Sequence, residues 1–343
     1  THSRDWFWAV ALRSMSRKVM GRDFSDRPFP GPVAGHPAGL AAHGHNRRPM
    51  PAFTARQTLL LIALTLIWGI NWPVMKLGVQ HFPPLSFRMA SMWVGLPILA
   101  AFVVWRRLPL AVPRACWPRL AQLTLFNMVL WNSLIIIAIP MLSSGRAAIL
   151  GYTMPIFSAV LGSLFFHDRL APRAWAGVAA ALAGVLLLLW HEVGALGSRP
   201  IGVGLMLAAA LSWAFGTQKL RRAEVPVPLL TMTLWMVALT ALTLTVLAFV
   251  FERHLWHWPD AQATGAIVFN GVLVLGFGQT VWFFLARSLP PVASTLSVML
   301  IPVLGVFSGA VGLGEVLHWQ DWAAVGLMML SIAAVLWPKR QAS

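Results

Sequence analysis

Ten long apolar runs follow one another between residues 57 and 337 of this 343-residue chain. Each run is close to the ~20 residues that a helix needs to cross ~30 Å of hydrocarbon. Backbone groups cannot remain unpaired in lipid, so runs of this kind must form helices. The sequence therefore predicts an all-α integral membrane protein with ten transmembrane helices. We place them at residues 57–79, 85–105, 118–139, 145–166, 172–190, 201–219, 229–251, 262–285, 292–313 and 319–337.

The composition excludes an ordinary soluble domain. Hydrophobic residues make up 58% of the chain and charged residues only 10%, whereas soluble domains have about 25% charged residues. The net charge of +16 arises from few charges in total. We therefore interpret it as a signal of membrane orientation and expect no nucleic-acid partner. The single cysteine, Cys116, excludes an internal disulfide and a cysteine-based metal cluster.

Lysine and arginine are distributed unevenly between the two sides of the membrane. With the N-terminus inside, the inner segments hold 21 of these residues and the outer loops hold only Arg146, Arg199 and Arg253. Basic residues favour the cytoplasmic side. Both termini are therefore predicted to be cytoplasmic, in a multi-pass protein of the plasma membrane (the bacterial inner membrane). Residues 1–50 contain no long apolar run, and we expect a disordered basic extension, with Met50 as a candidate start of the native protein.

The second half of the chain repeats the first. A shift of 147 residues places the fourth and fifth runs on the ninth and tenth, and Pro155 then aligns with Pro302. A shift of 145 residues places the first run on the sixth. Because five spans is an odd number, the second half must enter the membrane in the opposite orientation. We predict two inverted five-helix repeats, 51–195 and 196–343, an architecture typical of alternating-access transporters. A duplicated structural membrane protein without transport is the alternative.

Short motifs recur at matching places in the runs. They are Trp68-Gly69-Ile70-Asn71-Trp72-Pro73-Val74-Met75-Lys76 in the first run, Phe87-Arg88 in the second, Gly145-Arg146-Ala147-Ala148, Pro155 and Asp168-Arg169-Leu170 around the fourth, and Ala293-Ser294, Pro302 and Gly314-Glu315 around the ninth. Over about residues 57–337 this pattern resembles EamA-type transporters of the drug/metabolite transporter superfamily, with Asp168 where the family has Glu. The resemblance implies secondary export of small metabolites or drugs, often coupled to protons.

Polar and aromatic residues inside the runs form the predicted substrate cavity. Polar side chains within a membrane usually face a cavity or another helix, and small-molecule sites combine apolar walls with a few polar groups. Packing between helices is the alternative role for each of them. The predicted cavity residues are Trp68, Asn71, Trp72, Lys76, Arg88, Trp131, Asn132, Tyr152, Trp213, Asn270, Gln279 and Trp282.

Two of these cavity residues, Lys76 and Arg88, are basic and lie near the predicted outer ends of the first two runs. Facing the cavity, they would bind a substrate carboxylate or phosphate, Arg88 in a bidentate manner. Snorkelling to the membrane surface is the alternative. None of the ten acidic residues lies in the middle of a run. The small multidrug resistance branch of the superfamily uses a buried Glu in its first span, so we disfavour hydrophobic cations as substrates.

Matched interruptions mark the fourth and ninth runs. Pro155 and Pro302 each remove a backbone donor in mid-span, and paired breaks in corresponding helices indicate a transport site. We predict hinges at both, with a simple packing kink as the alternative. Asp168 and Glu315 close the same runs on opposite faces. They are predicted to act as gates or coupling groups, or else as helix caps and ion-pair partners.

The predicted function is secondary active export of small zwitterionic or anionic metabolites, such as amino acids or their derivatives. We expect a small-molecule substrate, the lipid bilayer and, from the resemblance, protons as partners, in a monomer or homodimer. No cofactor or metal is expected. A lipid-carrier flippase or a non-transporting membrane subunit would share the fold and remains open. An intramembrane enzyme is disfavoured because histidines such as His81 and His318 lie at span ends and no nucleophile–base set is visible.

Overall fold

The computed structural model describes residues 54–167, 172–194, 199–223, 225–288 and 291–336. Within these ranges all regular structure is helical and no strand occurs, which confirms the all-α prediction. Seven stretches are long and apolar enough to cross a membrane, and the shorter stretches Pro172–Leu188 and Leu300–Leu313 are also apolar. The seven are Ala55–His81, Pro84–Trp105, Arg114–Met141, Ser144–Phe166, Pro200–Arg221, Leu229–Leu255 and Ala261–Trp282.

The first helix of the first half, α2, begins with a capping box. The Thr54 hydroxyl accepts from the Gln57 backbone N–H at 3.2 Å, and the Gln57 side chain accepts from the Thr54 backbone N–H at 3.0 Å. This reciprocal pair satisfies backbone donors that the first turn leaves open. The first-half helices are α2 (Ala55–His81), α3 (Pro84–Trp105), α4 (Trp117–Thr124), α5 (Leu130–Ala138), α6 (Ser144–Gly151), α7 (Met154–Phe166) and α8 (Pro172–Gly194).

The second half contains a corresponding series of helices. In both halves the third span changes from α-helix to π-helix in its middle, at η2 (Leu125–Val129) and η5 (Phe269–Gly278). Short 3₁₀ turns, η1 (Arg114–Cys116), η3 (Ile139–Met141) and η4 (Arg253–Leu255), flank α4, α5 and α10. The second-half helices are α9 (Arg199–Arg221), α10 (Leu229–Glu252), α11 (Ala261–Val268), α12 (Gln279–Ser288), α13 (Pro291–Leu313) and α14 (Trp319–Leu336).

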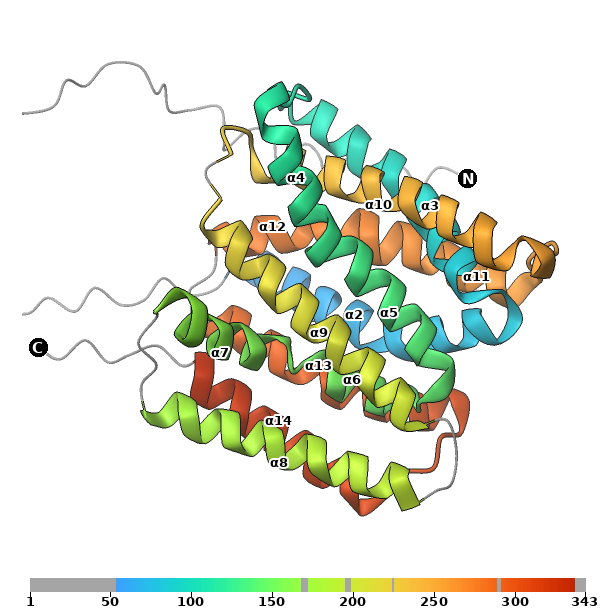
Figure 1. Ribbon diagram of the computed structural model, residues 1–343. Coiled ribbons are helices and arrows are strands. Elements are labelled where there is room, and N and C mark those ends of the chain that lie inside the picture. Colours follow the sequence, from blue (N-terminus) through green and yellow to red (C-terminus); the bar gives the residue numbers. More distant parts are fainter. Residues whose placement is uncertain (1–53, 168–171, 195–198, 224, 289–290, 337–343) are drawn as a thin grey trace, which may run out of the picture. The chain divides into compact units, whose positions relative to one another are not determined.

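Helices pack mainly against partners from the other half of the chain. Extensive contacts join α8 with α14, α2 with α13, α3 with α10, and α9 with α5 and α7. In Figure 1, α8 and α14 run side by side below α13, while α3 and α10 run side by side above it. Glycine permits the closest approaches, because a Cβ built on Gly145 of α6 would lie 2.9 Å from the Val306 Cα of α13.

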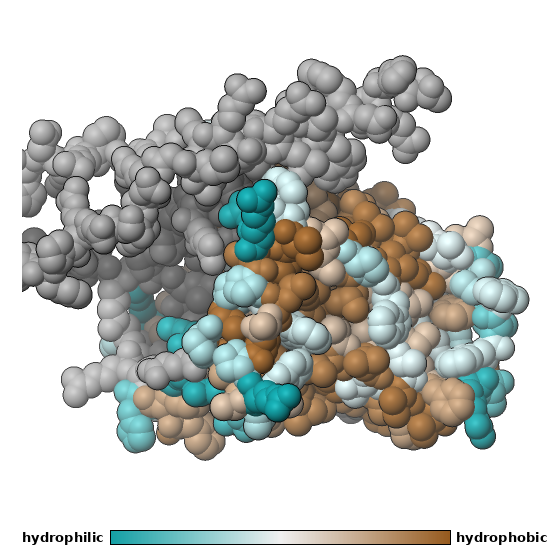
Figure 2. Space-filling view, turned by 90° about the horizontal axis from the view of Figure 1, so that it is seen from above, coloured by the Kyte–Doolittle hydropathy of each residue, from teal (hydrophilic) through white to brown (hydrophobic). Residues whose placement is uncertain are grey.

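The surface of the helical unit is strongly apolar. Large side chains such as Leu182, Leu330 and Val246 are more than half exposed. In Figure 2, brown apolar residues cover much of the coloured face, and the deepest teal residues gather towards its margins. Apolar side chains that point outward from a helical bundle are expected where the solvent is lipid.

Candidate functional site

The fourth span of the first half is a broken helix. Helix α6 ends at Gly151, Tyr152 and Thr153 form a turn, and α7 begins at Met154. The Thr153 hydroxyl and backbone N–H both donate to the Leu150 carbonyl, at 2.6 and 3.2 Å. Pro155 lies in the first turn of α7, where its missing N–H costs nothing. The break lies in mid-span beside Pro155, and the role of this proline as a hinge stays a prediction.

Four predicted aromatic residues meet at this break. The Trp72 and Tyr152 ring centroids are 6.4 Å apart in an edge-on arrangement, and those of Trp131 and Trp213 are 6.3 Å apart. Gly151 joins the two pairs, because a Cβ built there would lie 2.7 Å from Trp72 and 3.6 Å from Trp131. Trp72 and Tyr152 are buried, at 5% and 6% exposure. These four side chains form one aromatic cluster, which joins α2, α5, α9 and the α6–α7 turn.

A second pair of predicted aromatics lies apart from this cluster. The centroids of Trp68 and Trp282 are 5.7 Å apart, joining α2 to α12. The Trp68 indole nitrogen lies 2.8 Å from a Cβ built on Gly278, so the glycine makes room for the ring. Gln279, the next residue along the chain, is half-buried. These contacts are tight packing between helices.

Some of the predicted amide side chains have hydrogen-bond partners for their polar atoms, and others have none in the described part of the chain. The Asn132 and Asn270 side chains donate to carbonyls one turn earlier, at 2.7 and 3.1 Å. Asn71 is only 8% exposed, and its side-chain oxygen has no hydrogen-bond partner among the described residues. Asn270 lies in π-helix η5 and Asn127 at the matched place in π-helix η2. Single π-helical turns are frequent at functional sites.

Lys76 and Glu315 meet across the two halves. The Lys76 ammonium lies 3.1 Å from a Glu315 carboxylate oxygen and donates to the Leu142 carbonyl at 2.6 Å. Glu315 also accepts from the Ser144 backbone N–H at 2.8 Å and from its hydroxyl at 2.7 Å. We call Lys76, Leu142, Ser144 and Glu315 the Glu315 network. Both charged side chains are largely buried, so the pair is shielded from screening by salt.

A left-handed turn places Glu315 in this network. Gly314 follows the last residue of α13 and has a φ of +64°. Glycine adopts this conformation without a steric penalty, and it turns the chain so that Glu315 reaches back to Ser144 at the start of α6. Glu315 lies at the end of the helical bundle where α2 ends and α3 begins, because it pairs with Lys76 near the end of α2. We call this end of the bundle the Glu315 end.

Further polar contacts at the Glu315 end also join the two halves, and the sequence did not single them out. The Arg146 Nε donates to Asp321 at 2.7 Å, and both side chains are buried. Buried Glu252 accepts from the backbone N–H groups of Leu85 and Ser86, at 2.9 and 2.8 Å. Charges in membrane helices seldom lie apart from a partner, and the structure supplies one for each of Arg146 and Glu252 from the other half.

One more contact at this end involves a group outside the apolar stretches. Asp260 is the N-cap of α11 and lies 2.8 Å from the His81 ring. The Ala263 backbone N–H, which donates to Asp260 at 2.7 Å, holds the pKa of that carboxyl below its ordinary value, and His81 lowers it further. The carboxylate form is therefore favoured at the start of α11, where the helix dipole also stabilises it.

Arg88 is the second basic residue of the predicted cavity. It lies near the start of α3, four residues after Pro84, and is 4% exposed. Its Nη1 donates to the Asn270 side-chain oxygen at 3.3 Å, its Nη2 contacts the Met75 sulfur, and its Nε has no partner among the described residues. Unlike Lys76, it makes no ion pair with a described carboxylate.

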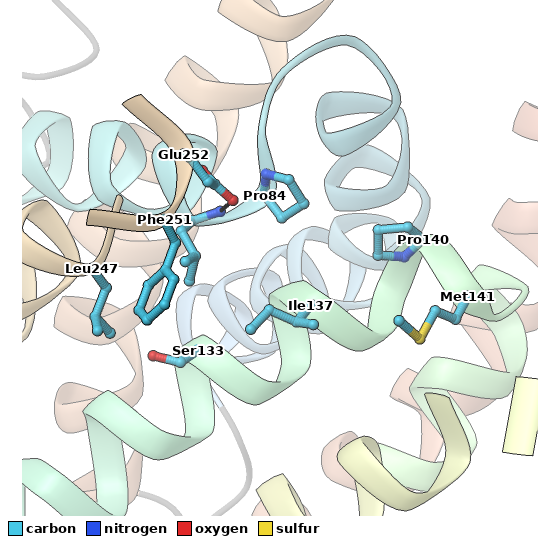
Figure 3. A pocket seen from close by; sticks show the side chains of 9 residues that line it. Pro84, Ser133, Ile137, Pro140, Met141, Leu247, Phe251 and Glu252 are labelled. Atoms are coloured by element: carbon cyan, nitrogen blue, oxygen red, sulfur yellow. Dashed lines mark hydrogen bonds between the residues drawn. The ribbon is translucent and has the colours of Figure 1, made fainter. Parts of the chain in front are cut away.

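An apolar cleft opens between α3, α5 and α10 at the Glu315 end. It has a volume of about 580 Å³. Figure 3 shows Ile137, Leu247 and Phe251 along it, with the Ser133 hydroxyl among them. That hydroxyl is buried and lacks a hydrogen-bond partner in the described part of the chain. Glu252 lies at one edge, engaged by the start of α3.

Two predicted positions remain, the hinge at Pro302 and the gate at Asp168. Pro302 lies inside α13, which continues through it as one helix, so no break matches the one beside Pro155. Asp168 lies outside the described residues, and its role stays a prediction. Most of the predicted cavity residues therefore fall into four groups: the aromatic cluster, the pair of Trp68 and Trp282, the Glu315 network, and the surroundings of Arg88.

The family of this chain follows from its sequence as a whole. The EamA-like transporter family matches residues 56–190 and 200–337. The chain belongs to this family and is a multi-pass membrane transporter of the plasma membrane. The resemblance read from the motifs is thereby confirmed.

Several relatives match over most of their length. They include the uncharacterized transporter YoaV of Bacillus subtilis, 27% identical over 74% of this chain and 88% of its own length. The uncharacterized inner membrane transporter YedA of Escherichia coli is 28% identical over 84% and 92%. A probable amino-acid metabolite efflux pump of Salmonella typhimurium is 26% identical over 80% and 92%. A crystal structure with 21% identity shares the fold, with a TM-score of 0.61 over 81% of this chain and 95% of the other.

Proposed function

We propose that this protein exports small zwitterionic or anionic metabolites, such as amino acids or their derivatives, by alternating access. The observation that carries the proposal is the Glu315 network, a buried ion pair that joins the two halves at one end of the helices. Such a contact can hold one side of a transporter closed while the other is open. The efflux-pump relative supports the substrate class, and the aromatic cluster with its nearby amides supplies suitable walls.

The proposed architecture has ten spans in two inverted five-helix repeats, with both termini cytoplasmic. The family matches, 56–190 and 200–337, support a boundary near residues 195 and 196. Support also comes from the packing, since α2 lies against α13 and its counterpart α9 lies against α7. In this arrangement α8, α13 and α14 complete the set of spans, and the Glu315 end faces outward.

In the proposed cycle the substrate binds beside the break in the fourth span. Trp72, Trp131, Tyr152 and Trp213 form its apolar wall. Pro155 and Pro302 allow the fourth and ninth spans to bend, and Glu315 opens and closes the outer side. Protonation of Glu315 would weaken its attraction to Lys76, so the same carboxylate is the proposed coupling group for protons. Asp168, its match in the first repeat, is proposed for the opposite face from the sequence alignment alone.

A reversible cross-link between α6 and α13 tests this proposal. The built Gly145 Cβ lies 3.3 Å from the Val306 Cβ, close to the ~3.8 Å that a disulfide requires. Gly145→Cys and Val306→Cys would be combined with Cys116→Ser, which removes the only native cysteine. Extracellular metabolites are then profiled in cells that express this variant, before and after oxidation, with each single-cysteine variant as control.

The expected result is that one compound class accumulates outside the cells, stops doing so after oxidation, and resumes after reduction. Accumulation that oxidation leaves unchanged would contradict alternating access at this end but leave export standing. If cells that express the unmodified protein have the same extracellular profile as cells without it, export itself is contradicted.

The apolar cleft beside α5 favours one second candidate, flipping of a lipid carrier. Its lining offers a path for an acyl chain, with the unpartnered Ser133 hydroxyl as a single polar contact. Under this alternative no small metabolite accumulates outside, whereas labelled lipid carrier changes leaflet in vesicles that contain the protein.

A further inference from the structure

Arg88 has an unusual position for a cation in a membrane protein. Its guanidinium is almost fully buried at the contact of α2, α3 and η5. Charged groups at such positions are costly and usually have a partner of opposite charge. Within the described part of the chain, Arg88 makes polar contacts with the neutral Asn270 amide and the neutral Met75 thioether. The positive charge is therefore not balanced by any ion pair in the described structure.

Neighbouring charges are already engaged elsewhere. Glu252 lies near the start of α3, but its two oxygens accept from Leu85, from the Ser86 backbone and from the Ser86 hydroxyl. Lys76 is paired with Glu315. Arg88 is thus the basic residue of the predicted cavity that retains capacity for an anion.

The geometry of the guanidinium defines what kind of anion fits. A carboxylate binds arginine side-on through Nε and Nη2, which point in the same direction. The Arg88 Nη1 is held by Asn270, while Nε is unpartnered and Nη2 touches only the Met75 sulfur. A thioether is a weak acceptor on a flexible side chain, so it can yield to a better ligand. The free edge is the one that a carboxylate uses.

A second unpartnered group, the Asn71 side-chain oxygen, lies one helical turn before Met75 on α2. Asn71 precedes Met75 by four residues on α2, and residues at this spacing share one face of a helix. The Asn71 side-chain oxygen is buried without a hydrogen-bond partner in the described chain. It is an acceptor, which suits the ammonium group of a zwitterion, whereas Arg88 is a donor that suits the carboxylate.

We infer that Arg88 binds the carboxylate of the transported substrate, that Asn71 accepts from its ammonium group, and that Lys76 is a gate residue without direct substrate contact. This inference rests on the proposed export function and narrows its substrates to compounds with a free carboxylate. Lys76 follows Met75 directly in α2, so movement that opens the Glu315 network also uncovers the guanidinium edge. The closed conformation explains why Arg88 is sealed from solvent here.

The test uses the full chain in proteoliposomes and two probes, leucine and leucinamide, which differ in the carboxylate. Arg88→Gln removes the charge, and Arg88→Lys keeps the charge without the planar fork. Arg253→Gln is the matched control, because Arg253 is exposed at the same end. Efflux is measured for each probe as kcat and KM, and binding as the shift in Tm that each probe causes.

The unmodified protein is expected to prefer leucine by about tenfold or more in kcat/KM, as expected for a charge-assisted bidentate contact. Arg88→Gln should remove this preference by raising KM for leucine, with leucinamide changed by less than about twofold. Arg88→Lys should restore part of it, and leucine should shift the Tm of the unmodified protein more than that of either variant.

Three outcomes would overturn the inference. If Arg88→Gln and Arg88→Lys lower kcat/KM equally for leucine and leucinamide, Arg88 only positions Asn270 and η5. An unmodified protein that moves both probes equally well would remove the carboxylate from recognition while export stands. If the unmodified protein moves neither probe, the proposed amino-acid export fails, and this inference fails with it.

Discussion

The fourth span and its counterpart in the second half start from a similar sequence plan and fold differently. Each has a proline at the matched position, but the first-half span breaks into α6 and α7, whereas α13 continues through Pro302. The residues before the prolines differ: Gly151-Tyr152-Thr153 in one case, and Val298-Met299-Leu300 in the other. Glycine and threonine are weak helix formers, whereas leucine and methionine are strong ones. Proline alone therefore does not break the helix, and its neighbours decide.

The helix that packs beside the break also differs between the halves. Trp72 presses against Gly151 in the first half. A shift of 145 residues matches Trp72 with Thr217, whose small side chain accepts from the Asn127 amide at 3.0 Å. Three of the four aromatic residues of the cluster thus come from the first half, and Trp213 on α9 comes from the second. A site of this kind is asymmetric even though the backbone arrangement repeats.

At their far ends the two spans agree again. His167 follows α7 with a φ of +58°, and its backbone N–H donates to the Gly162 carbonyl. Gly314 follows α13 with a φ of +64°, and the next N–H donates to the Gly309 carbonyl at 3.4 Å. The 147-residue shift matches both pairs. The turn before the acidic residue is therefore common to both halves, although different residues form it.

The largest effect is expected from Gly151→Val. This change gives the break in the fourth span the residue found at the matched position of α13, Val298. Gly151→Val would place a Cβ 2.7 Å from the buried Trp72 ring. Trp72 already lies against Gly305, so it has little room to retreat. We expect overpacking to cost about 1–3 kcal/mol, and misplaced cavity walls to lower efflux by at least about tenfold. Efflux from proteoliposomes and chemical unfolding in detergent measure the two effects.

Gly204→Val is the matched control for this change. Gly204 is exposed on α9, and a Cβ built there meets no atom within 4 Å. It should leave both readouts almost unchanged. Full efflux by Gly151→Val would show that the close contact between Gly151 and Trp72 is unimportant for transport.

A smaller effect with opposite signs is expected from replacing the two prolines. Pro302→Ala restores an N–H inside a continuous helix and should raise the free energy of unfolding by about 2 kcal/mol. Pro155→Ala acts in the first turn of α7, where proline is well tolerated, and should lower it by less than about 1 kcal/mol. Unfolding of both variants in the same detergent provides the comparison. The same sign for both would mean that the break does not distinguish the two spans.

Much of the fold could be predicted from the chain because apolar runs of ~20 residues have few alternatives in lipid. The matched motifs led to the correct family, since each recurred at an equivalent place. Aromatic residues deep in the runs could be recognised as a group because they lie too far from the interface to be anchors. Trp72, Trp131, Tyr152 and Trp213 do meet in one cluster.

The pairing of charges could not be read from the sequence. Lys76 and Arg88 look alike as basic residues near the ends of two runs, yet one is paired with Glu315 and the other has no described ion pair. Asp321 and Glu252 look like ordinary residues at helix ends, and both are buried against the other half. Such pairs depend on how distant helices pack, and no local pattern encodes that packing.

The smallest predicted effect concerns the turn that the two spans share. A non-glycine residue in the left-handed region is strained by about 1 kcal/mol. His167→Gly should remove this strain, less the extra backbone entropy of glycine, and should stabilise the protein by about 0.5 kcal/mol. Gly314→Ala should introduce the strain and destabilise it by about 1 kcal/mol. Unfolding in detergent measures both variants. If Gly314→Ala also disrupts the Glu315 network, its loss of stability should exceed the ~1 kcal/mol expected from backbone strain. Unchanged stability in both variants would mean that the backbone relaxes at these turns without cost.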